Sequence, residues 1–277
     1  LEGSSVRAAG RIANQRDMGR AAFMDIKDWT GVIQAFFQLN RLGEEPFQIQ
    51  KQLDAGDLVG VEGNLVKTRT GEKTIFVERF RVLAKALLRP PEKWHGLRDR
   101  EKRYRRRAVD LFTNEEVMDC FLTRSQIIRA IRDYLQERGF IEVETPMMQS
   151  VPGGAAARPF RTHHNALDID LYLRIAPELH LKRLLVGGMQ RVFEVNRNFR
   201  NEGVSTRHNP EFTMLEIYEA YGDYTSMMQL AEGLISHLAQ DVRGSSALPF
   251  GEAMIDYCPP WPRRAFWDLL DERLGLQ

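Results

Sequence analysis

The chain has little cysteine and no long apolar run. Its two cysteines, Cys120 and Cys258, stand far apart in 277 residues and fit no metal-ligand spacing. We therefore expect reduced thiols of an intracellular protein rather than a disulfide framework. No apolar run approaches the ~18 residues of a membrane helix, and no secretory signal is recognisable. The sequence predicts a cytoplasmic protein without membrane contact, and Leu1 in place of methionine suggests a fragment.

The net charge of +1 conceals an uneven distribution. Residues 1–109 contain 22 Lys and Arg against 14 Asp and Glu, whereas residues 110–277 contain 17 against 24. A basic front half suggests a polyanionic partner for that half. Chance segregation of solvated surface charge fits the same numbers equally well.

The first 85 residues show short alternating segments separated by turn residues. A helix is expected at Pro46–Leu53, between the third and fourth strands, and Arg69–Glu72 is expected to form a hairpin turn. Five strands with a helix in that place predict an all-β OB-fold barrel, an architecture that often binds oligonucleotides. The expected strands are Ser5–Ile12, Ala22–Lys27, Val32–Leu39, Leu58–Thr68 and Lys73–Leu83.

A basic linker is expected at residues 86–110, between a domain at 1–85 and one at 111–277. It contains Pro90 and Pro91 and then the run RDREKRYRRR at Arg98–Arg107. Such a run is typical of a solvated helix, but it could equally bind nucleic-acid phosphates.

Residues 111–277 mix helical and strand patterns. Apolar residues at helical spacing predict a long helix at Glu115–Arg138, which Gly139 ends. We expect an α+β domain, an antiparallel sheet with flanking helices that is incomplete at the C-terminal end. Its other expected elements are Ile141–Glu144, Leu171–Ile175, Pro177–Val186, Tyr224–Asp241, Ala253–Tyr257 and Phe266–Leu274.

The segment Arg191–Tyr221 is expected to form a hairpin with one unusually polar face. Strand side chains alternate between faces, so Phe193, Val195 and Phe199 oppose the polar set. A hairpin with one solvated face is common, but here that face would expose the apolar ring of Phe212 to water, so we favour a ligand site. The proposed site face carries Val192, Glu194, Asn196, Asn198, Arg200, Glu202, Phe212, Met214, Glu216, Tyr218 and Ala220.

Four motifs in this half carry a family resemblance. FRNEG at Phe199–Gly203 and RHNPEFT at Arg207–Thr213 resemble the second signature motif of class II aminoacyl-tRNA synthetases. LRIAPELHLKRLLVGG at Leu173–Gly188 and VPGGAAARPFRTHHNALD at Val151–Asp168 resemble the lysine-specific, bacterial-type members. The resemblance runs from about Val6 to the end of the chain. It implies that L-lysine is activated by ATP to lysyl-adenylate and transferred to tRNA(Lys).

The resemblance also implies roles for individual residues, with Arg200 and Glu202 as the catalytic pair. Arg200 would hold the α-phosphate and the amino-acid carboxylate, a task suited to a guanidinium. The implied ATP-binding residues are Arg200, Glu202, Arg207, His208, Asn209 and Phe212. The implied lysine-binding residues are Gly154, Glu178, Arg200, Glu216 and Tyr218. The implied anticodon-binding residues are Arg16, Phe23 and Gln34.

Charge favours lysine independently, because a lysine pocket must neutralise two ammonium groups. Glu216 and Tyr218 share the site face, and Glu178 opens a helix after Pro177. Alone, Glu178 would more simply be a first-turn acid that stabilises the helix dipole by ~0.3–1 kcal/mol.

The resemblance further implies a homodimer that uses ATP and Mg²⁺. The third family motif and the metal-binding acids are not found in the sequence, so no metal ligand is assigned within the chain. We expect this piece alone to be inactive. The alternatives are a truncated, non-catalytic paralogue that binds tRNA or another nucleic acid, and an aspartate- or asparagine-type synthetase. A lysine ligase acting on a translation factor is disfavoured, because those relatives lack the N-terminal barrel.

Overall fold

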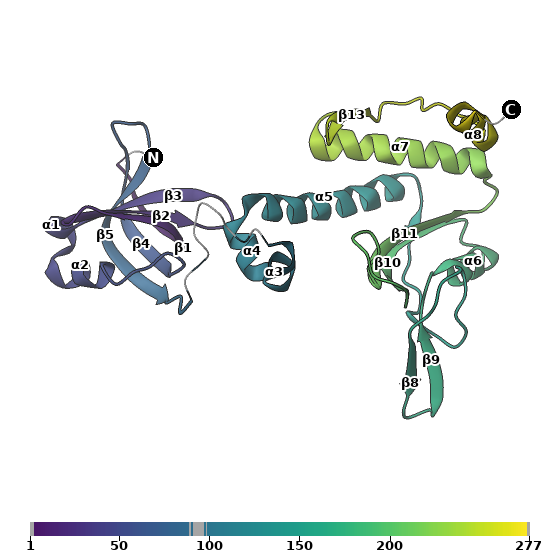
Figure 1. Ribbon diagram of the computed structural model, residues 1–277, viewed down its shortest axis with the longest axis horizontal. Helices are drawn as coiled ribbons and strands as arrows, with labels where there is room; N and C mark the ends of the chain where they lie inside the picture. The colour runs from purple at the N-terminus through teal and green to yellow at the C-terminus, as the bar shows by residue number, and fades with distance from the viewer. Residues whose placement is uncertain (1–2, 89, 91–96, 98, 276–277) are drawn as a thin grey trace. The chain divides into compact units, whose positions relative to one another are not determined.

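The computed structural model describes residues 3–88, 90, 97 and 99–275 (Figure 1). Contacts group the chain into two compact units, Leu1–Met118 and Asp119–Gln277. Each unit has its own hydrophobic cluster. The domain limits at residues 85 and 110 stay a prediction.

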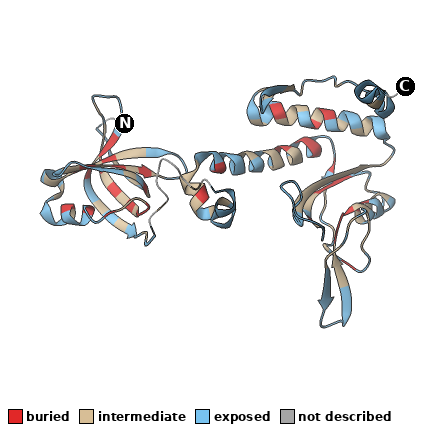
Figure 2. Ribbon diagram, in the orientation of Figure 1, coloured by how far each residue is buried: buried red, intermediate tan, exposed pale blue. Residues whose placement is uncertain are grey.

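The first unit is a closed five-stranded barrel, which confirms the predicted OB-fold. Its strands follow the spatial order β1-β2-β3-β5-β4. Alternate residues of β2, β3 and β4 are buried, and they form the barrel core with residues of β1 and β5 (Figure 2). The strands are β1 (Ser5–Asp17), β2 (Ala21–Lys27), β3 (Val32–Gln38), β4 (Leu58–Lys67) and β5 (Lys73–Ala84).

Two short helices, rather than one, connect β3 to β4. They are α1 (Leu39–Leu42) and α2 (Glu44–Gln50). Gly43 separates them with a φ of 82°, a value that glycine adopts readily. The predicted helix Pro46–Leu53 was therefore wrong in its bounds. Phe47 and Leu53 still reach the barrel core.

The basic linker is partly helical and folds onto the barrel. It contributes α3 (Arg100–Arg105) and α4 (Arg107–Thr113). Asp110 is fully buried and accepts hydrogen bonds from Arg103 Nε at 2.8 Å and from Arg107. On the barrel side, the Arg11 guanidinium lies 4.6 Å from the Phe112 ring centroid. Of the basic run, Arg98 lies outside the described residues.

A three-stranded sheet forms the centre of the second unit, in the order β11-β10-β6. β10 (Arg191–Phe199) and β11 (Glu211–Glu219) are antiparallel, and β6 (Ile141–Glu142) runs parallel to β10. Helices α5 (Glu115–Glu137) and α7 (Tyr224–Arg243) pack on one face of this sheet. The antiparallel hairpin with flanking helices confirms the predicted α+β class.

A second small sheet has the order β7-β9-β8. β7 (Met148–Gln149) and β8 (Arg161–His164) flank β9 (Ile169–Leu173), and α6 (Glu178–Val186) follows. The predicted strand Leu171–Ile175 was wrong in its bounds, since β9 begins two residues earlier and ends at Leu173. β7 and β8 were not predicted, since both are short and β8 is polar throughout.

Three elements complete the described part of the second unit. β12 (Ala247–Phe250), which was not predicted, pairs with β13 (Ala253–Asp256), and α8 (Phe266–Leu274) follows. The predicted strand Ile141–Glu144 proved shorter, ending at Glu142 as β6. None of the helices in the described part of the chain is long and apolar enough to cross a membrane.

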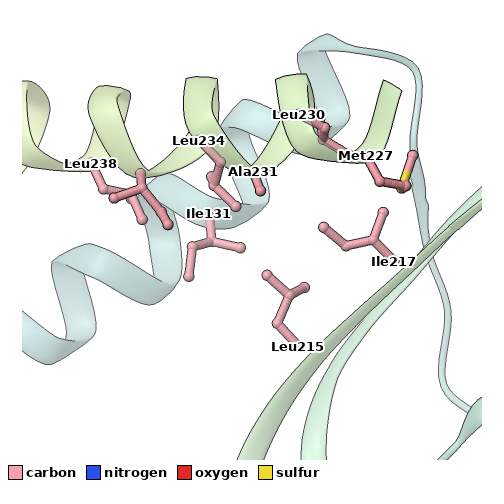
Figure 3. A pocket seen from close by; sticks show the side chains of 9 residues that line it. Ile131, Leu215, Ile217, Met227, Leu230, Ala231, Leu234 and Leu238 are labelled. Carbon is pink, nitrogen blue, oxygen red and sulfur yellow. The ribbon is translucent and has the colours of Figure 1, made fainter. Parts of the chain in front are cut away.

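An apolar groove of about 410 Å³ lies between α5, α7 and β11 (Figure 3). Ile131, Leu215 and Ile217 face the row of apolar side chains on α7. This groove adjoins the hydrophobic cluster and lies on the face of the hairpin opposite the polar one. Its lining residues are Ile131, Leu215, Ile217, Met227, Leu230, Ala231, Leu234, Ile235 and Leu238.

The close approach of β5 to β4 leaves no room for a side chain at Gly63. A Cβ on Gly63 would lie 2.0 Å from the Phe76 carbonyl oxygen, which is part of the neighbouring backbone. We predict that Gly63→Ala destabilises the barrel by at least ~1–3 kcal/mol, because a strand must move. Gly60→Ala in the same strand is the control, since its Cβ would meet Leu83 at an ordinary 3.8 Å. Denaturant unfolding compares the two variants, and equal stabilities would show that the approach of β5 does not require glycine at position 63.

Candidate functional site

The register of β10 and β11 puts the predicted polar residues on one face. Glu194 pairs with Glu216, Asn196 with Met214 and Asn198 with Phe212. On the opposite face, Phe193 and Ile217 join the cluster formed with α5 and α7. The predicted division into a core face and a polar face is therefore confirmed.

A buried ion pair lies beneath the polar face. Arg174 is fully buried and Glu194 is 1% exposed, and Arg174 Nη1 lies 2.7 Å from Glu194 Oε1. Thr145 Oγ1 donates to Glu194 Oε2 at 2.7 Å, and Arg174 Nε donates to the carbonyl oxygen of Arg197 at 2.9 Å. These bonds tie the loop before β7 and the end of β9 to the middle of β10.

The sequence prediction gave Arg174 and Thr145 no role. The available signal was an arginine between the apolar residues Leu173 and Ile175. A cation in such a stretch needs a buried partner, because an unpaired charge is rarely buried. The sequence alone does not identify that partner, since Glu194 lies 20 residues further along the chain.

Glu216 and Tyr218 form the acidic end of the site face. The Tyr218 hydroxyl donates to Glu216 Oε2 at 3.1 Å. Burial raises the pKa of Glu216, and the negative charges of Glu178 and Glu194 raise it further. Burial and the neighbouring Glu216 carboxylate also raise the pKa of Tyr218. Three carboxylates thus influence one another here, which makes the region favourable for a cation.

Glu178 stands in the first turn of α6, next to the glycine-rich loop. Gly154 has a φ of +89°, and a Cβ there would lie 3.0 Å from Glu178 Cβ and 3.3 Å from Ala176 Cβ. The loop therefore approaches Glu178 as closely as glycine allows. Glu178 Oε1 is bound by Lys182 Nζ at 2.5 Å, so this carboxylate accepts an ammonium group. Its place in the first turn also suits the helix dipole.

Arg200 and Phe212 form the other end of the face. The Arg200 guanidinium lies 5.2 Å from the Phe212 ring centroid, and its Nε donates to Ile175 O at 3.4 Å. In the described part of the chain, no carboxylate neutralises Arg200. A half-buried guanidinium without an acidic partner is suited to bind an anion.

The predicted phosphate-binding loop follows β10, and the Arg200 N–H donates to Pro210 O at 2.8 Å across its base. Glu202 Oε1 accepts a hydrogen bond from the Arg158 N–H at 3.3 Å. His208 Nδ1 contacts Ser205 Oγ at 2.8 Å, which closes a small turn. Arg207 and Asn209 are exposed, and among the described residues no hydrogen bond links either to Arg200.

The three predicted anticodon-binding residues come together on the barrel. Arg16, Phe23 and Gln34 line a common cavity of about 430 Å³. The Phe23 ring stacks on Phe36 with centroids 4.4 Å apart, and Gln34 Oε1 accepts from Thr74 Oγ1 at 2.9 Å. The other lining residues are Met18, Thr68, Arg69, Thr70 and Glu72.

The role of the buried ion pair between Arg174 and Glu194 can be tested by substitution. We predict that Arg174→Met destabilises the second unit by about 3–5 kcal/mol, because Glu194 stays buried without its cation. The double variant Arg174→Met with Glu194→Leu should recover most of that loss. Urea unfolding measures both. The account is contradicted if the single variant lies within about 1 kcal/mol of the unsubstituted chain, or if the double variant is the less stable.

Comparison with known proteins finds a matching family model for each of the two units. The family model described as tRNA synthetases class II (D, K and N) matches residues 99–274. The model for the OB-fold nucleic acid binding domain matches residues 6–83.

Curated relatives agree with these matches over the whole chain. A Lysine--tRNA ligase of Pelotomaculum thermopropionicum is 57% identical over 276 residues, covering 100% of this chain and 54% of the relative. Proteins of the same name from Syntrophomonas wolfei and Carboxydothermus hydrogenoformans are 55% and 52% identical, with 56% and 57% of their lengths covered. The chain thus spans about half the length of the curated relatives it matches. With its barrel, its site hairpin and these matches, the chain belongs to the class II tRNA synthetase family of the D, K and N type.

Proposed function

We propose that the whole protein is a lysine–tRNA ligase, which activates L-lysine with ATP and transfers it to tRNA(Lys). The observation that carries the proposal is the distribution of charge along one hairpin face. Glu178 and Glu216 provide an acidic end, and the guanidinium of Arg200 provides a basic end. Lysine carries an ammonium group on its side chain and a carboxylate on its α-carbon, and these two remote charges match the two ends.

In the proposed reaction, a lysine carboxylate oxygen attacks the α-phosphorus of ATP. The new bond gives lysyl-adenylate, while the bond between the α-phosphorus and its bridging oxygen breaks and pyrophosphate leaves. Such a transfer depends on positioning and charge stabilisation rather than on a protein nucleophile. Arg200 would contact both the carboxylate and the α-phosphate and so hold the reacting atoms together.

The remaining roles concern ATP and the orientation of lysine. Phe212 offers a flat ring for adenine, and Arg207 and His208 would reach the outer phosphates. Glu202 and Asn209 would hold the adenine edge or a water bound to the metal ion. Gly154 would let backbone amides of its loop approach the α-amino end. Tyr218 would accompany Glu216 at the side-chain ammonium.

Use of Mg²⁺ by the whole protein belongs to the same proposal. Among the described residues, no cluster of three His, Cys, Asp or Glu could hold a metal ion. The described residues therefore do not form a metal site on their own.

The barrel is proposed to bind the anticodon of tRNA(Lys), with Arg16, Phe23 and Gln34 as contacts. A cation, a stacking ring and an amide are the groups that single-stranded RNA sites use. We further propose a cytoplasmic homodimer, as the family resemblance implies.

Two alternatives receive less support. An aspartate- or asparagine-type enzyme would place its substrate side chain against Glu178 and Glu216, and aspartate would be repelled there. A truncated, non-catalytic tRNA-binding paralogue would have no need for an acidic end opposite Arg200.

We predict that Glu216→Gln in the intact protein raises the KM for lysine about tenfold, because ~1.4 kcal/mol of attraction is lost. The KM for ATP should stay within about twofold. Exchange of labelled pyrophosphate into ATP measures both constants. The control is Glu211→Gln, an exposed carboxylate on the same strand that pairs with Arg197.

The raised pKa of Glu216 should make the KM for lysine depend on pH. As the pH falls through that raised pKa, the carboxylate becomes neutral, so the KM for lysine should rise. The rise should begin at a higher pH than an ordinary glutamate would give, and Glu216→Gln should abolish it. An unchanged lysine KM in the variant would contradict the proposed pocket.

A further inference from the structure

Three phenylalanine rings form a row across the outer face of the barrel. Phe23 on β2 pairs with Phe36 on β3, and Phe36 pairs with Phe76 on β5. The first two rings are stacked with centroids 4.4 Å apart, and the next two meet edge to face at 5.1 Å. The rings therefore form one continuous aromatic surface over three neighbouring strands.

This row lies outside the barrel core. The next residues along the strands, Met24, Phe37 and Val77, are fully buried, whereas Phe23, Phe36 and Phe76 remain partly exposed. Cross-strand aromatic pairs stabilise a sheet by roughly 0.2–1 kcal/mol, which would account for one pair on a solvated face. A row of three that ends in a cavity offers more aromatic surface than that role requires.

A guanidinium stands at each end of the row. Arg16 on β1 pairs with Phe23, and Arg41 in α1 lies 5.2 Å from the Phe76 ring centroid. Neither arginine has a carboxylate partner in the described ranges. Elsewhere on the same barrel, Arg79 pairs with Glu62 and Lys85 with Asp57. The two cations flanking the rings are thus left with their full charge.

We propose that Arg41 binds a backbone phosphate of a single-stranded RNA segment that crosses the row from the Phe23 cavity towards Phe76. This deepens the proposed anticodon role by adding a second contact, beyond Arg16, Phe23 and Gln34. The cavity at Phe23 does not include Arg41 or Phe76 among its lining residues. The RNA strand therefore contacts two separate places on the barrel.

The pairing of Arg41 with a ring rather than an acid suits this task. A neutral ring holds the guanidinium through its quadrupole and leaves the positive charge available to a phosphate. A salt bridge would instead have to be broken when RNA arrives. Phe76 and Phe36 act as positioning residues, since they fix Arg41 and Phe23 at the two ends of one rigid row.

The test is the salt dependence of RNA binding by the whole chain. The probe is a labelled anticodon stem-loop RNA of tRNA(Lys), with binding followed by fluorescence anisotropy at several KCl concentrations. Loss of one phosphate contact makes the slope of log K against log[salt] shallower by about 0.7 for a single strand. We expect Arg41→Gln to show this change and to raise Kd about three- to tenfold at low salt.

Arg81→Gln is the matched control, because it removes the same charge from an exposed position on β5. It should leave the salt slope unchanged. Thermal unfolding of Arg41→Gln should match that of the unsubstituted chain, so that lost binding does not reflect lost structure. An unchanged slope in Arg41→Gln overturns the inference, and so does an equal change of slope in Arg81→Gln. In both cases the proposed anticodon role stands. If the unsubstituted chain does not bind the stem-loop, the inference and the anticodon role fail together.

Discussion

The pairing register of β10 with β11 is the constraint on which the site depends. A slip of one residue would turn Glu216 and Phe212 towards α5 and α7, and would bring Leu215 and Ile217 to the ligand face. Two interactions hold the register from opposite sides. Phe193 and Ile217 are packed into the apolar cluster, while Glu194 is bonded to the buried Arg174. Apolar packing and a buried ion pair thus specify the same alignment.

The buried pair also shapes the electrostatics of the site. Arg174 takes up much of the charge of Glu194, so the acids left to face a ligand are Glu216 and Glu178, the latter in contact with Lys182. Those two acids and Arg200 lie on elements joined through the same network: Arg200 bonds to Ile175 O, and Ile175 follows Arg174 directly. The support beneath the face therefore fixes the relative positions of the groups that would bind the two ends of lysine.

The sequence predicted much of this arrangement, and its failures have physical reasons. Strict alternation in β10 and β11 predicted both faces. The same period found the barrel strands, but the prediction ended the first strand at Ile12, whereas β1 runs on to Asp17. The break between α1 and α2 was missed because it rests on one positive φ at Gly43. The linker was predicted as solvated or phosphate-binding, yet Asp110 binds Arg103 and Arg107, a partnership that only the fold reveals. Likewise, the sequence did not single out Phe36 and Phe76, because only the strand register shows that they lie beside Phe23.

The central claim is that one hairpin face recognises lysine by its side-chain ammonium group at one end and by its α-carboxylate at the other. The most direct measurement is exchange of labelled pyrophosphate into ATP by the intact protein, with each of the common amino acids supplied in turn. The account predicts exchange with lysine, and none with aspartate or asparagine. Exchange with aspartate or asparagine in the absence of exchange with lysine would contradict it.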